Sequence, residues 1–397
     1  MFGALDDNPR VIASGNYAAP HPLLAMLDAE VASYRLFMLN AQAGLPDRDG
    51  VVLETCFVGP GMRTSKRLRY IPSRLSLVPR LFATTVPPDV VLLHTSPPRD
   101  GHVSLGTEVN VLPAAVEAVR ARGGVVVAQL NPQMPFTFGD AQLPVELVDY
   151  AVEADGPLPA PPPAARDEVA EAIGDAVVER ILDGATLQLG IGTVPDAVLH
   201  RLVERRGLRV WSEMFSDGVL ELDRHGALDP DELLTASFLF GSAELLRWVD
   251  GNERVRLLRT ETVNEPAVIA RNRMMTSINT ALQVDLFAQA NASRIAGRIY
   301  SGFGGQTDFI VGALHSDCGQ ALVALRAWHP KAGVSTIVPL VNGPVTSFQH
   351  TAVITEHGVA ELFGRSERDQ AEQLIERTAD PRARPELWAA AAEMGLS

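Results

Sequence analysis

The chain has 397 residues, enough for two or three domains. It is 46% hydrophobic and 21% charged, which predicts a large core and excludes global disorder. The net charge of −14 argues against a nucleic-acid partner, which would need a basic face. Two distant cysteines offer no metal-ligand spacing. The absence of a signal sequence and of an apolar run of about 18–20 residues predicts a cytoplasmic protein without a membrane span.

The first half of the chain opens with a strand-like run, which is followed by a glycine turn at Gly15, by Pro20 and by an apolar helical pattern. Two more apolar runs follow, DVVLLHT at 89–95 and GVVVAQL at 124–130. Short continuous apolar runs that alternate with helices are typical of parallel sheets, whose ligand sites lie at the carboxyl ends of the strands.

A proline-rich stretch at residues 154–170 predicts an extended linker, because proline at this density is incompatible with a helix or a central strand. After it, apolar residues recur at helical spacing, namely Val169, Ile173, Val177 and Ile181. The chain is therefore predicted to divide into residues 1–160 and residues 161–397.

The second half opens like the first. In ATLQLGIGTVPDAVLHRL, residues 185–202, Gly190 aligns with Gly15 and Pro195 aligns with Pro20. Both segments predict a strand, a glycine turn and an apolar helix with proline near its start. The repeat, with the linker between its copies, predicts two similarly built α/β domains.

Further strand-like runs follow in the second half: TLQLGI (186–191), LRVWSEM (208–214), STIVPLV (335–341) and TAVITE (351–356). Glu213 comes at the end of the second of these runs. Partial desolvation there would raise its pKa and make it a candidate nucleophile or base; the alternative is a carboxylate that caps the next segment. Glu356 is a second carboxylate at a strand end.

Three other segments allow either a structural or a ligand role. The turn at Gly190 and Gly192 resembles a phosphate-binding turn, but it lacks a third glycine and a following lysine. Asn264, two residues before a proline, could be a helix cap or a ligand. The stretch SGFGGQTDF, with Gly302, Gly304, Gly305 and Gln306, could be a plain turn or a place where a ligand touches main-chain N–H groups.

Seven segments in chain order resemble the acetyl-CoA hydrolase/transferase family: LQLGIGTVPDAVL, SEMFSDGV, ASFLFGS, INTALQVDLFAQAN, SGFGGQTDF, IVPL and ITEHGVAEL. The similarity is dense over residues 184–378 and looser in the first half, at SGNYAAPHPLL and HTSPPRDGHVSLG. It implies an α/β protein of two tandem, related, open domains of the CoA-transferase type, with mostly parallel sheets.

The resemblance also implies roles for individual residues. Glu213 matches the family's nucleophile, a backbone N–H of Gly304 or Gly305 would donate to the oxyanion, and Asn264 would be a polar group near it. The residues implied in binding coenzyme A, or in organising its site, are Gly190, Gly192, Gly302, Gln306 and Glu356. His357 stands where the family usually has an aromatic residue, a difference that concerns the acyl substrate.

The implied activity is a CoA-transferase that moves CoA between a short-chain acyl-CoA and a carboxylic acid through a glutamyl-CoA thioester. Coenzyme A would be a substrate, with no tightly bound cofactor and no metal, and we expect a homodimer. An acyl-CoA hydrolase would use the same residues, and an assay with and without an acceptor acid separates the two. A non-catalytic CoA- or sugar-phosphate-binding domain would be expected to lack the glutamate or the glycine loop.

Overall fold

The computed structural model describes residues 2, 5, 7–161, 167–190, 192–347 and 349–397. They form two compact units. Unit 1 comprises Met1–Pro161, Leu233–Asn264 and Ile299–Gly305, and unit 2 comprises Pro162–Glu232, Glu265–Arg298 and Gln306–Ser397. The chain first passes between units close to the predicted boundary at residue 160. Unit 1 also takes in segments 233–264 and 299–305, which the sequence placed in the second domain.

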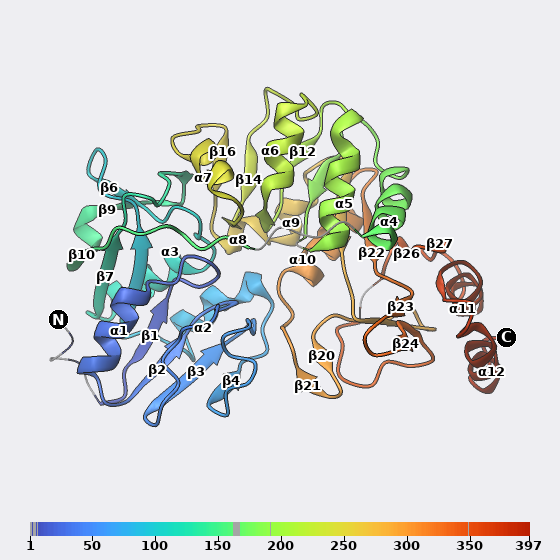
Figure 1. Ribbon diagram of the computed structural model, residues 1–397, viewed down its shortest axis with the longest axis horizontal. Coiled ribbons are helices and arrows are strands. Elements are labelled where there is room, and N and C mark those ends of the chain that lie inside the picture. The colour runs from blue at the N-terminus through green and yellow to red at the C-terminus, as the bar shows by residue number, and fades with distance from the viewer. Residues whose placement is uncertain (1, 3–4, 6, 162–166, 191, 348) are drawn as a thin grey trace. The chain divides into compact units, whose positions relative to one another are not determined.

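Unit 1 is built on a parallel sheet (Figure 1). Among the residues described, its strands lie in the order β10 (Tyr150–Glu153), β7 (Val125–Leu130), β5 (Val90–Thr95), β1 (Arg10–Ala13), β2 (Tyr34–Phe37), β3 (Val51–Thr55), β4 (Leu68–Tyr70). All neighbouring pairs are parallel. The predicted strands at 89–95 and 124–130 are confirmed as β5 and β7.

The strands of this sheet form because their residues are apolar on both faces. All six residues of β5 are buried, and so are all four of β1. Helices pack beside the sheet and complete the core, in which the rings of Phe37 and Phe82 meet edge to face at 5.3 Å. The helices of unit 1 are α1 (His21–Glu30), α2 (Val78–Ala83), α3 (Leu112–Ala121), α7 (Ala243–Val249) and α8 (Thr260–Val263), with the 3₁₀ turns η1 (Leu75–Leu77) and η2 (Val145–Leu147).

Smaller strands complete unit 1. They are β6 (His102–Ser104), β9 (Gln142–Pro144), β8 (Phe138–Gly139), β14 (Leu234–Ala236), β15 (Phe238–Leu239) and β16 (Val255–Leu257). β6 pairs with β9, and β16 lies between β14 and β8. The pairing of β16 with β8 explains why segment 233–264 belongs to this unit.

Unit 2 has its own sheet, which is parallel except at one edge. The described strands lie in the order β12 (Arg209–Val210), β11 (Thr186–Gln188), β17 (Met275–Asn279), β22 (Gln320–Ala324), β26 (Ala352–Thr355), β27 (Gly358–Glu361). The last pair is antiparallel. The prediction of α/β units with mostly parallel sheets is therefore confirmed.

The remaining elements of unit 2 cover this sheet and extend it toward the C-terminus. The helices are α4 (Glu168–Val178), α5 (Thr193–Arg201), η3 (Leu202–Glu204), α6 (Asp217–Arg224), α9 (Pro266–Ile269), α10 (Gln306–His315), α11 (Glu367–Gln373), the π-turn η4 (Leu374–Thr378) and α12 (Arg384–Glu393). Figure 1 shows α4, α5 and α6 side by side. Short strands are β13 (Met214–Phe215), β18 (Gln283–Asp285), β19 (Ala290–Asn291), β20 (Arg294–Ile295), β23 (Trp328–His329), β24 (Val334–Ser335) and β25 (Ile337–Val338), and β21 (Arg298–Ile299) follows at the boundary of the units.

Several predicted elements differ in extent. The run 208–214 is not one strand, because β12 ends at Val210 and β13 starts at Met214. The run 335–341 holds only short strands. Strand 186–191 ends at Gln188, and Ile191 lies outside the described residues, as does the 162–166 part of the linker.

Each sheet has a point where the strand order reverses. In unit 1, β1 is followed in sequence by β2, β3 and β4 on one side, while β5, β7 and β10 lie on the other. In unit 2 the corresponding point lies between β11 and β17. Ligands of open α/β sheets bind at the carboxyl ends of the strands beside such a point. The topology thus singles out two places, one in each unit.

Candidate functional site

The glycine loop, residues 301–305, is an extended segment held by unit 1. Gly302 bridges to Phe57, and Gly304 bridges to Arg74. The Val58 N–H donates to the Ser301 carbonyl at 2.9 Å, and the Leu75 N–H donates to the Gly304 carbonyl at 3.0 Å. The loop is therefore fixed by backbone hydrogen bonds on both sides.

For two of the three glycines, the structure shows why no larger residue fits. A Cβ on Gly302 would lie 2.4 Å from the Cys56 carbonyl oxygen, so any side chain there collides with backbone. Gly304 has φ of 56°, and its Cβ would lie 3.0 Å from the Phe57 ring. The predicted contact of Gly302 with coenzyme A and the predicted oxyanion role of Gly304 and Gly305 stay predictions.

Asn264 is fully buried at the end of α8. The side chain that caps the next helix, α9, belongs to Glu265, which accepts from the Ala267 N–H. Asn264 is thus not the N-cap of α9 but the C-cap residue of α8, with its N–H donating to the Thr260 carbonyl, so a helix-cap role and a ligand role both stay open. A buried amide at a helix junction is costly unless its hydrogen bonds are made.

Glu213 lies in a bend between β12 and β13, and its side chain is half-buried. The next residue, Met214, forms an antiparallel bridge with Leu189, which directly precedes Gly190. The bend therefore lies beside the carboxyl end of β11, at the reversal point of the sheet of unit 2. This is the position that the topology of an open α/β sheet favours for chemistry.

Ser212 holds this bend from inside. Its side chain is fully buried, and its Oγ accepts from the Leu189 N–H at 3.0 Å. The same Oγ lies 2.6 Å from the Met214 carbonyl oxygen and 3.2 Å from the Leu189 carbonyl oxygen. One hydroxyl thus contacts backbone groups on both sides of the turn that carries Glu213.

A buried polar chain leads to the same point from β17. The Asn279 amide donates to Ser277 Oγ at 2.7 Å, and Ser277 Oγ donates to Gln188 Oε1 at 2.8 Å. Gln188 Nε2 in turn donates to the Leu189 carbonyl at 3.1 Å. No motif in the sequence singles out these residues. Their signal was a polar side chain inside an otherwise apolar strand, at Gln188 in TLQLGI.

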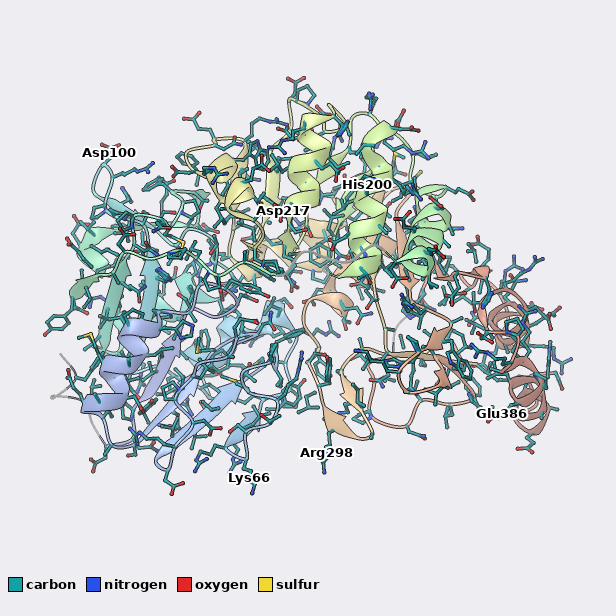
Figure 2. All side chains as sticks on the ribbon, in the orientation of Figure 1. Lys66, Asp100, His200, Asp217, Arg298 and Glu386 are labelled. Carbon is teal, nitrogen blue, oxygen red and sulfur yellow. The ribbon has the colours of Figure 1, made fainter. Side chains whose placement is uncertain are left out.

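Gly190 and Gly192 lie in the turn between β11 and α5. Gly192 is exposed and has φ of 113°, a conformation close to exclusive to glycine. The first turn of α5 carries Asp196, whose pKa is raised by burial and by the Asp217 carboxylate. Figure 2 labels Asp217 at the start of α6. A carboxylate in the first turn of α5, that of Asp196, repels a phosphate bound at this helix start.

Glu356 and Gln306 have different surroundings. Glu356 lies in the two-residue turn between β26 and β27, and its Oε2 accepts from the Ala327 N–H at 2.8 Å. This bond ties the β26–β27 hairpin to the segment after β22. Gln306 begins α10, and within the described part of the chain its buried Nε2 has no hydrogen-bond partner. An unsatisfied buried donor costs about 1–3 kcal/mol, so a ligand oxygen there would be stabilising.

The reversal point of unit 1 has a buried carboxyl group that the sequence analysis did not single out. Glu108 Oε1 accepts from the Gly15 N–H and from the Asn110 amide, each at 3.0 Å. Within the residues described, Oε2 makes no hydrogen bond. Burial raises the pKa of Glu108 to about 7, although the hydrogen bonds from Asn110 and Gly15 and the nearby Asn16 side chain lower it. Gly15, two residues beyond β1, is thus anchored by a side chain.

Sequence comparison decides the family. The N-terminal domain of acetyl-CoA hydrolase/transferase matches residues 42–160, and the C-terminal domain of the same family matches residues 241–391. A 4-hydroxybutyrate coenzyme A transferase of Clostridium kluyveri is 38% identical over 83% of this chain and 80% of its own length. This chain belongs to the acetyl-CoA hydrolase/transferase family.

Other members of the acetyl-CoA hydrolase/transferase family align over different lengths. A succinyl-CoA:acetate/propanoyl-CoA:succinate CoA transferase of Fasciola hepatica is 36% identical over 94% of this chain and 83% of its own length. An acetyl-CoA hydrolase of Kluyveromyces lactis is 31% identical over 51% of this chain and 39% of its own length. The protein is therefore an enzyme of a family that contains both CoA transferases and acetyl-CoA hydrolases.

Solved structures of similar proteins share the fold. RipA from Yersinia pestis superposes with a TM-score of 0.93 at 27% identity, covering 100% of this chain and 96% of its own. A 4-hydroxybutyrate CoA-transferase from Porphyromonas gingivalis superposes with a TM-score of 0.83 at 30% identity, covering 98% of this chain and 95% of its own.

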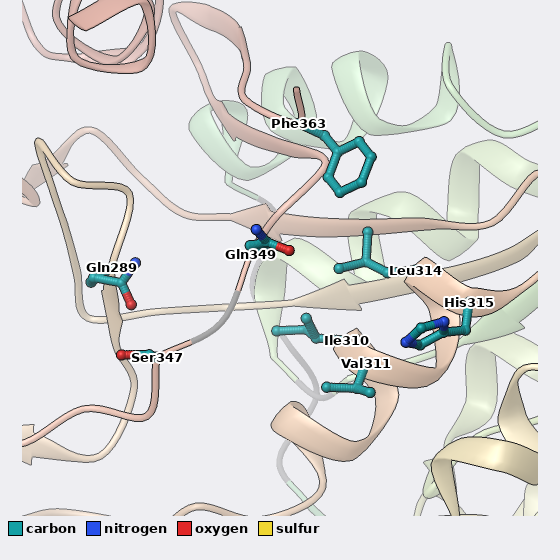
Figure 3. Close-up of a pocket in the computed structure, with 8 residues that line it drawn as sticks. All are labelled: Gln289, Ile310, Val311, Leu314, His315, Ser347, Gln349 and Phe363. Carbon is teal, nitrogen blue, oxygen red and sulfur yellow. The ribbon is translucent and has the colours of Figure 1, made fainter. Parts of the chain in front are cut away.

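Unit 2 also has two surface grooves that are lined by other residues. Figure 3 shows one of about 540 Å³, where α10 presents Ile310, Val311 and Leu314 opposite Phe363. A second, polar groove of about 730 Å³ runs along α4, α5 and α6. Neither is lined by a residue that the sequence predicted to be catalytic. In the parts of the chain that the structure describes, no helix is long and apolar enough to span a membrane, and no cluster of three or more His, Cys, Asp or Glu side chains could hold a metal ion.

Proposed function

We propose that this protein is a CoA-transferase that moves CoA between a short-chain acyl-CoA and a carboxylic acid, with Glu213 as its nucleophile. One observation supports transferase over hydrolase. Three CoA transferases at 33–38% identity align over 82–94% of this chain, whereas three acetyl-CoA hydrolases at 30–31% identity align over 51% of it. Over most of its length, the chain thus resembles transferases.

The proposed cycle needs only carboxylate and thioester chemistry. A carboxylate oxygen of Glu213 attacks the acyl-CoA carbonyl, the C–S bond breaks, and CoA leaves as thiolate from an acyl-glutamyl anhydride. The thiolate then attacks the glutamyl carbonyl, which releases the first carboxylic acid as its carboxylate and leaves a glutamyl-CoA thioester. An acceptor carboxylate reverses these two steps. Dividing the exchange in this way predicts ping-pong kinetics.

The other predicted residues fit supporting roles. A backbone N–H of Gly304 or Gly305 would donate to the tetrahedral oxyanion, and one such donor is worth roughly 3 kcal/mol. Asn264 would contribute a further polar contact near it. The acidic surroundings of Gly190 and Gly192 favour contact with the uncharged pantetheine arm of coenzyme A over its phosphates. Glu356 would organise the site, and Gln306 has a buried donor to offer.

Covalent labelling tests the proposal. When acetyl-CoA or butyryl-CoA is added without an acceptor acid, the protein should gain the mass of CoA at one residue. Borohydride should reduce the adduct to an alcohol, hydroxylamine should trap it as a hydroxamate, and peptide mapping should place both changes on Glu213.

Variants sharpen this test. Glu213→Gln should neither label nor turn over, because an amide is a poor nucleophile. Glu213→Asp should lose about 100-fold in rate, because its carboxylate is withdrawn by one methylene. Glu179→Gln, which changes an exposed glutamate of the same unit, is the matched control and should label normally. A label on Glu265 or Glu356 would refute the assignment.

Acyl-CoA hydrolysis is the second candidate, because acetyl-CoA hydrolases are among the relatives. In that reaction water intercepts the same intermediate. Thioester loss that continues without an acceptor, and does not speed up with acetate, succinate or butyrate, would favour it. Coenzyme A as substrate with no tightly bound cofactor, a homodimer and a cytoplasmic location are further parts of the proposal. Mass spectrometry of the native protein, light scattering and cell fractionation test them.

A further inference from the structure

The polar chain at the reversal point of unit 2 has a definite donor order. Asn279 donates to Ser277, Ser277 donates to Gln188, and Gln188 donates to the Leu189 carbonyl. The N–H of the same residue, Leu189, donates to Ser212 Oγ. Ser212 therefore receives one hydrogen bond and has one proton left to give.

That proton has one acceptor that satisfies every group. The Leu189 carbonyl, 3.2 Å from Ser212 Oγ, already accepts from Gln188. The Met214 carbonyl is nearer, at 2.6 Å. With the hydroxyl donating to Met214, each donor atom from Asn279 to Ser212 has an acceptor, which is what a buried network requires.

The position of Ser212 explains why a hydroxyl is needed there. The Trp211 N–H donates to the Leu187 carbonyl, so the ladder between β11 and β12 runs to that point. At Ser212 the chain leaves the strand direction of β12, so the Leu189 N–H has no backbone acceptor in β12. Ser212 Oγ accepts this hydrogen bond instead. Because the same oxygen holds Met214, the backbone on both sides of Glu213 is fixed to the end of β11.

We propose that Ser212 is the positioning residue of Glu213: its hydroxyl fixes the bend so that the carboxylate is presented at one place and angle. The inference rests on the proposed function, in which Glu213 is the nucleophile. Ser212 itself takes no part in bond making. Its effect is on the rate of the first covalent step, since misplacement of a reacting group by about 1 Å can cost 100-fold.

Ser316 provides a matched control. It is also buried, and its Oγ likewise accepts from a backbone N–H, that of Met275 at 3.2 Å, and donates to a carbonyl, that of Asn272. It lies at the amino end of β17, at the opposite edge of the sheet from Glu213. Ser316→Ala thus removes the same kind of hydrogen bonds without touching the bend.

The experiment compares Ser212→Ala, Ser212→Thr and Ser316→Ala with the wild type in full-length protein. The rate of adduct formation on Glu213 from saturating acetyl-CoA or butyryl-CoA is followed by rapid quenching and mass spectrometry, together with KM and thermal stability. We expect Ser212→Ala to lose roughly 10- to 100-fold in this rate while KM changes less than about threefold. Ser212→Thr, which keeps the hydroxyl, should regain part of the rate. Ser316→Ala should lose stability to a similar degree and keep its rate.

The outcomes separate the two proposals. If the wild type is never labelled on Glu213, both the proposed function and the role of Ser212 are overturned. If it is labelled, but Ser212→Ala forms the adduct as fast as Ser316→Ala does, or changes KM alone, only the role of Ser212 is overturned. Should Ser212→Ala not fold, Ser212→Cys takes its place, because a thiol of similar size makes weaker hydrogen bonds to Leu189 and Met214. A reduced labelling rate would then support the inference, and an unchanged rate would overturn it.

Discussion

Replacing Glu108 by glutamine should change how the stability of unit 1 depends on pH. The side chain is buried, and burial raises its pKa to about 7 from an ordinary value of 4.5. In the unfolded chain the carboxyl group ionises near the ordinary value. Between pH 4.5 and 7 the folded state therefore binds a proton that the unfolded state has lost, so this group's contribution to stability is complete at low pH and falls as pH rises.

The size of the effect follows from the two pKa values. A difference of about 2.5 at 1.36 kcal/mol for each pKa unit corresponds to about 3 kcal/mol, lost between pH 4.5 and 7. His94 acts in the opposite direction, because burial lowers its pKa to about 4, and its contribution is lost as pH falls from 6.5. The wild type can thus show little net dependence in this range. The difference between Glu108→Gln and the wild type isolates Glu108, since both proteins contain His94.

Hydrogen exchange is the suitable assay, because a chain of two units need not unfold in one step. The free energy of opening at the buried strand β1, next to Gly15, is compared between the two proteins at each pH from 4.5 to 8, which cancels the intrinsic pH dependence of exchange. Relative to the wild type, Glu108→Gln should gain about 3 kcal/mol across this range, whatever constant offset its amide introduces. Glu153→Gln, at an exposed glutamate of β10, is the control for the loss of a carboxylate that is not buried. If the difference for Glu108→Gln stayed constant within about 1 kcal/mol across this pH range, the raised pKa of Glu108 would be refuted.

Three shorter predictions concern other contacts. Gly302→Ala should lower the melting temperature, because its Cβ would lie 2.4 Å from the Cys56 carbonyl oxygen; an unchanged melting temperature would contradict this contact. In the native protein a thiol reagent should titrate Cys318, which is exposed, and leave Cys56, whose pKa burial raises to about 12; both should react in denaturant. Glu356→Ala should destabilise the β26–β27 hairpin by about 1–3 kcal/mol, because the Ala327 N–H loses its acceptor, and hydrogen exchange of β26 would report it.

The parallel strands could be predicted because a strand that is buried on both faces has a continuous run of apolar residues. DVVLLHT and GVVVAQL lie in β5 and β7, and each strand is covered on both faces. Segment 233–264 could not be assigned in this way. Its strand β16 pairs with Phe138–Gly139, more than a hundred residues earlier in the sequence. A local sequence pattern does not indicate which distant strand will be the partner.

In the candidate site, too, some features could be predicted from the sequence and others could not. The type of residue at Glu213 and the glycine content at 302–305 are visible in the sequence, so a glutamate and a bare backbone segment could be singled out. Their local structure was not visible. Glu213 does not end a strand but lies in a bend, and the bend depends on a hydroxyl that contacts Leu189, 23 residues earlier in the chain. Such a contact follows from strand order, which the sequence does not state.

The two reversal points show how a repeated framework can take different chemistry. In unit 1, the N–H of Gly15, just beyond β1, is held by a carboxylate, that of Glu108. In unit 2, one position earlier in the repeat, the N–H of Leu189 is held by a hydroxyl, that of Ser212. A carboxylate that anchors backbone in a buried place is tied to that task. Because a serine anchors the backbone in unit 2, the task does not fall to the glutamate beside it, and the proposed role of Glu213 in attack is compatible with a rigid sheet edge.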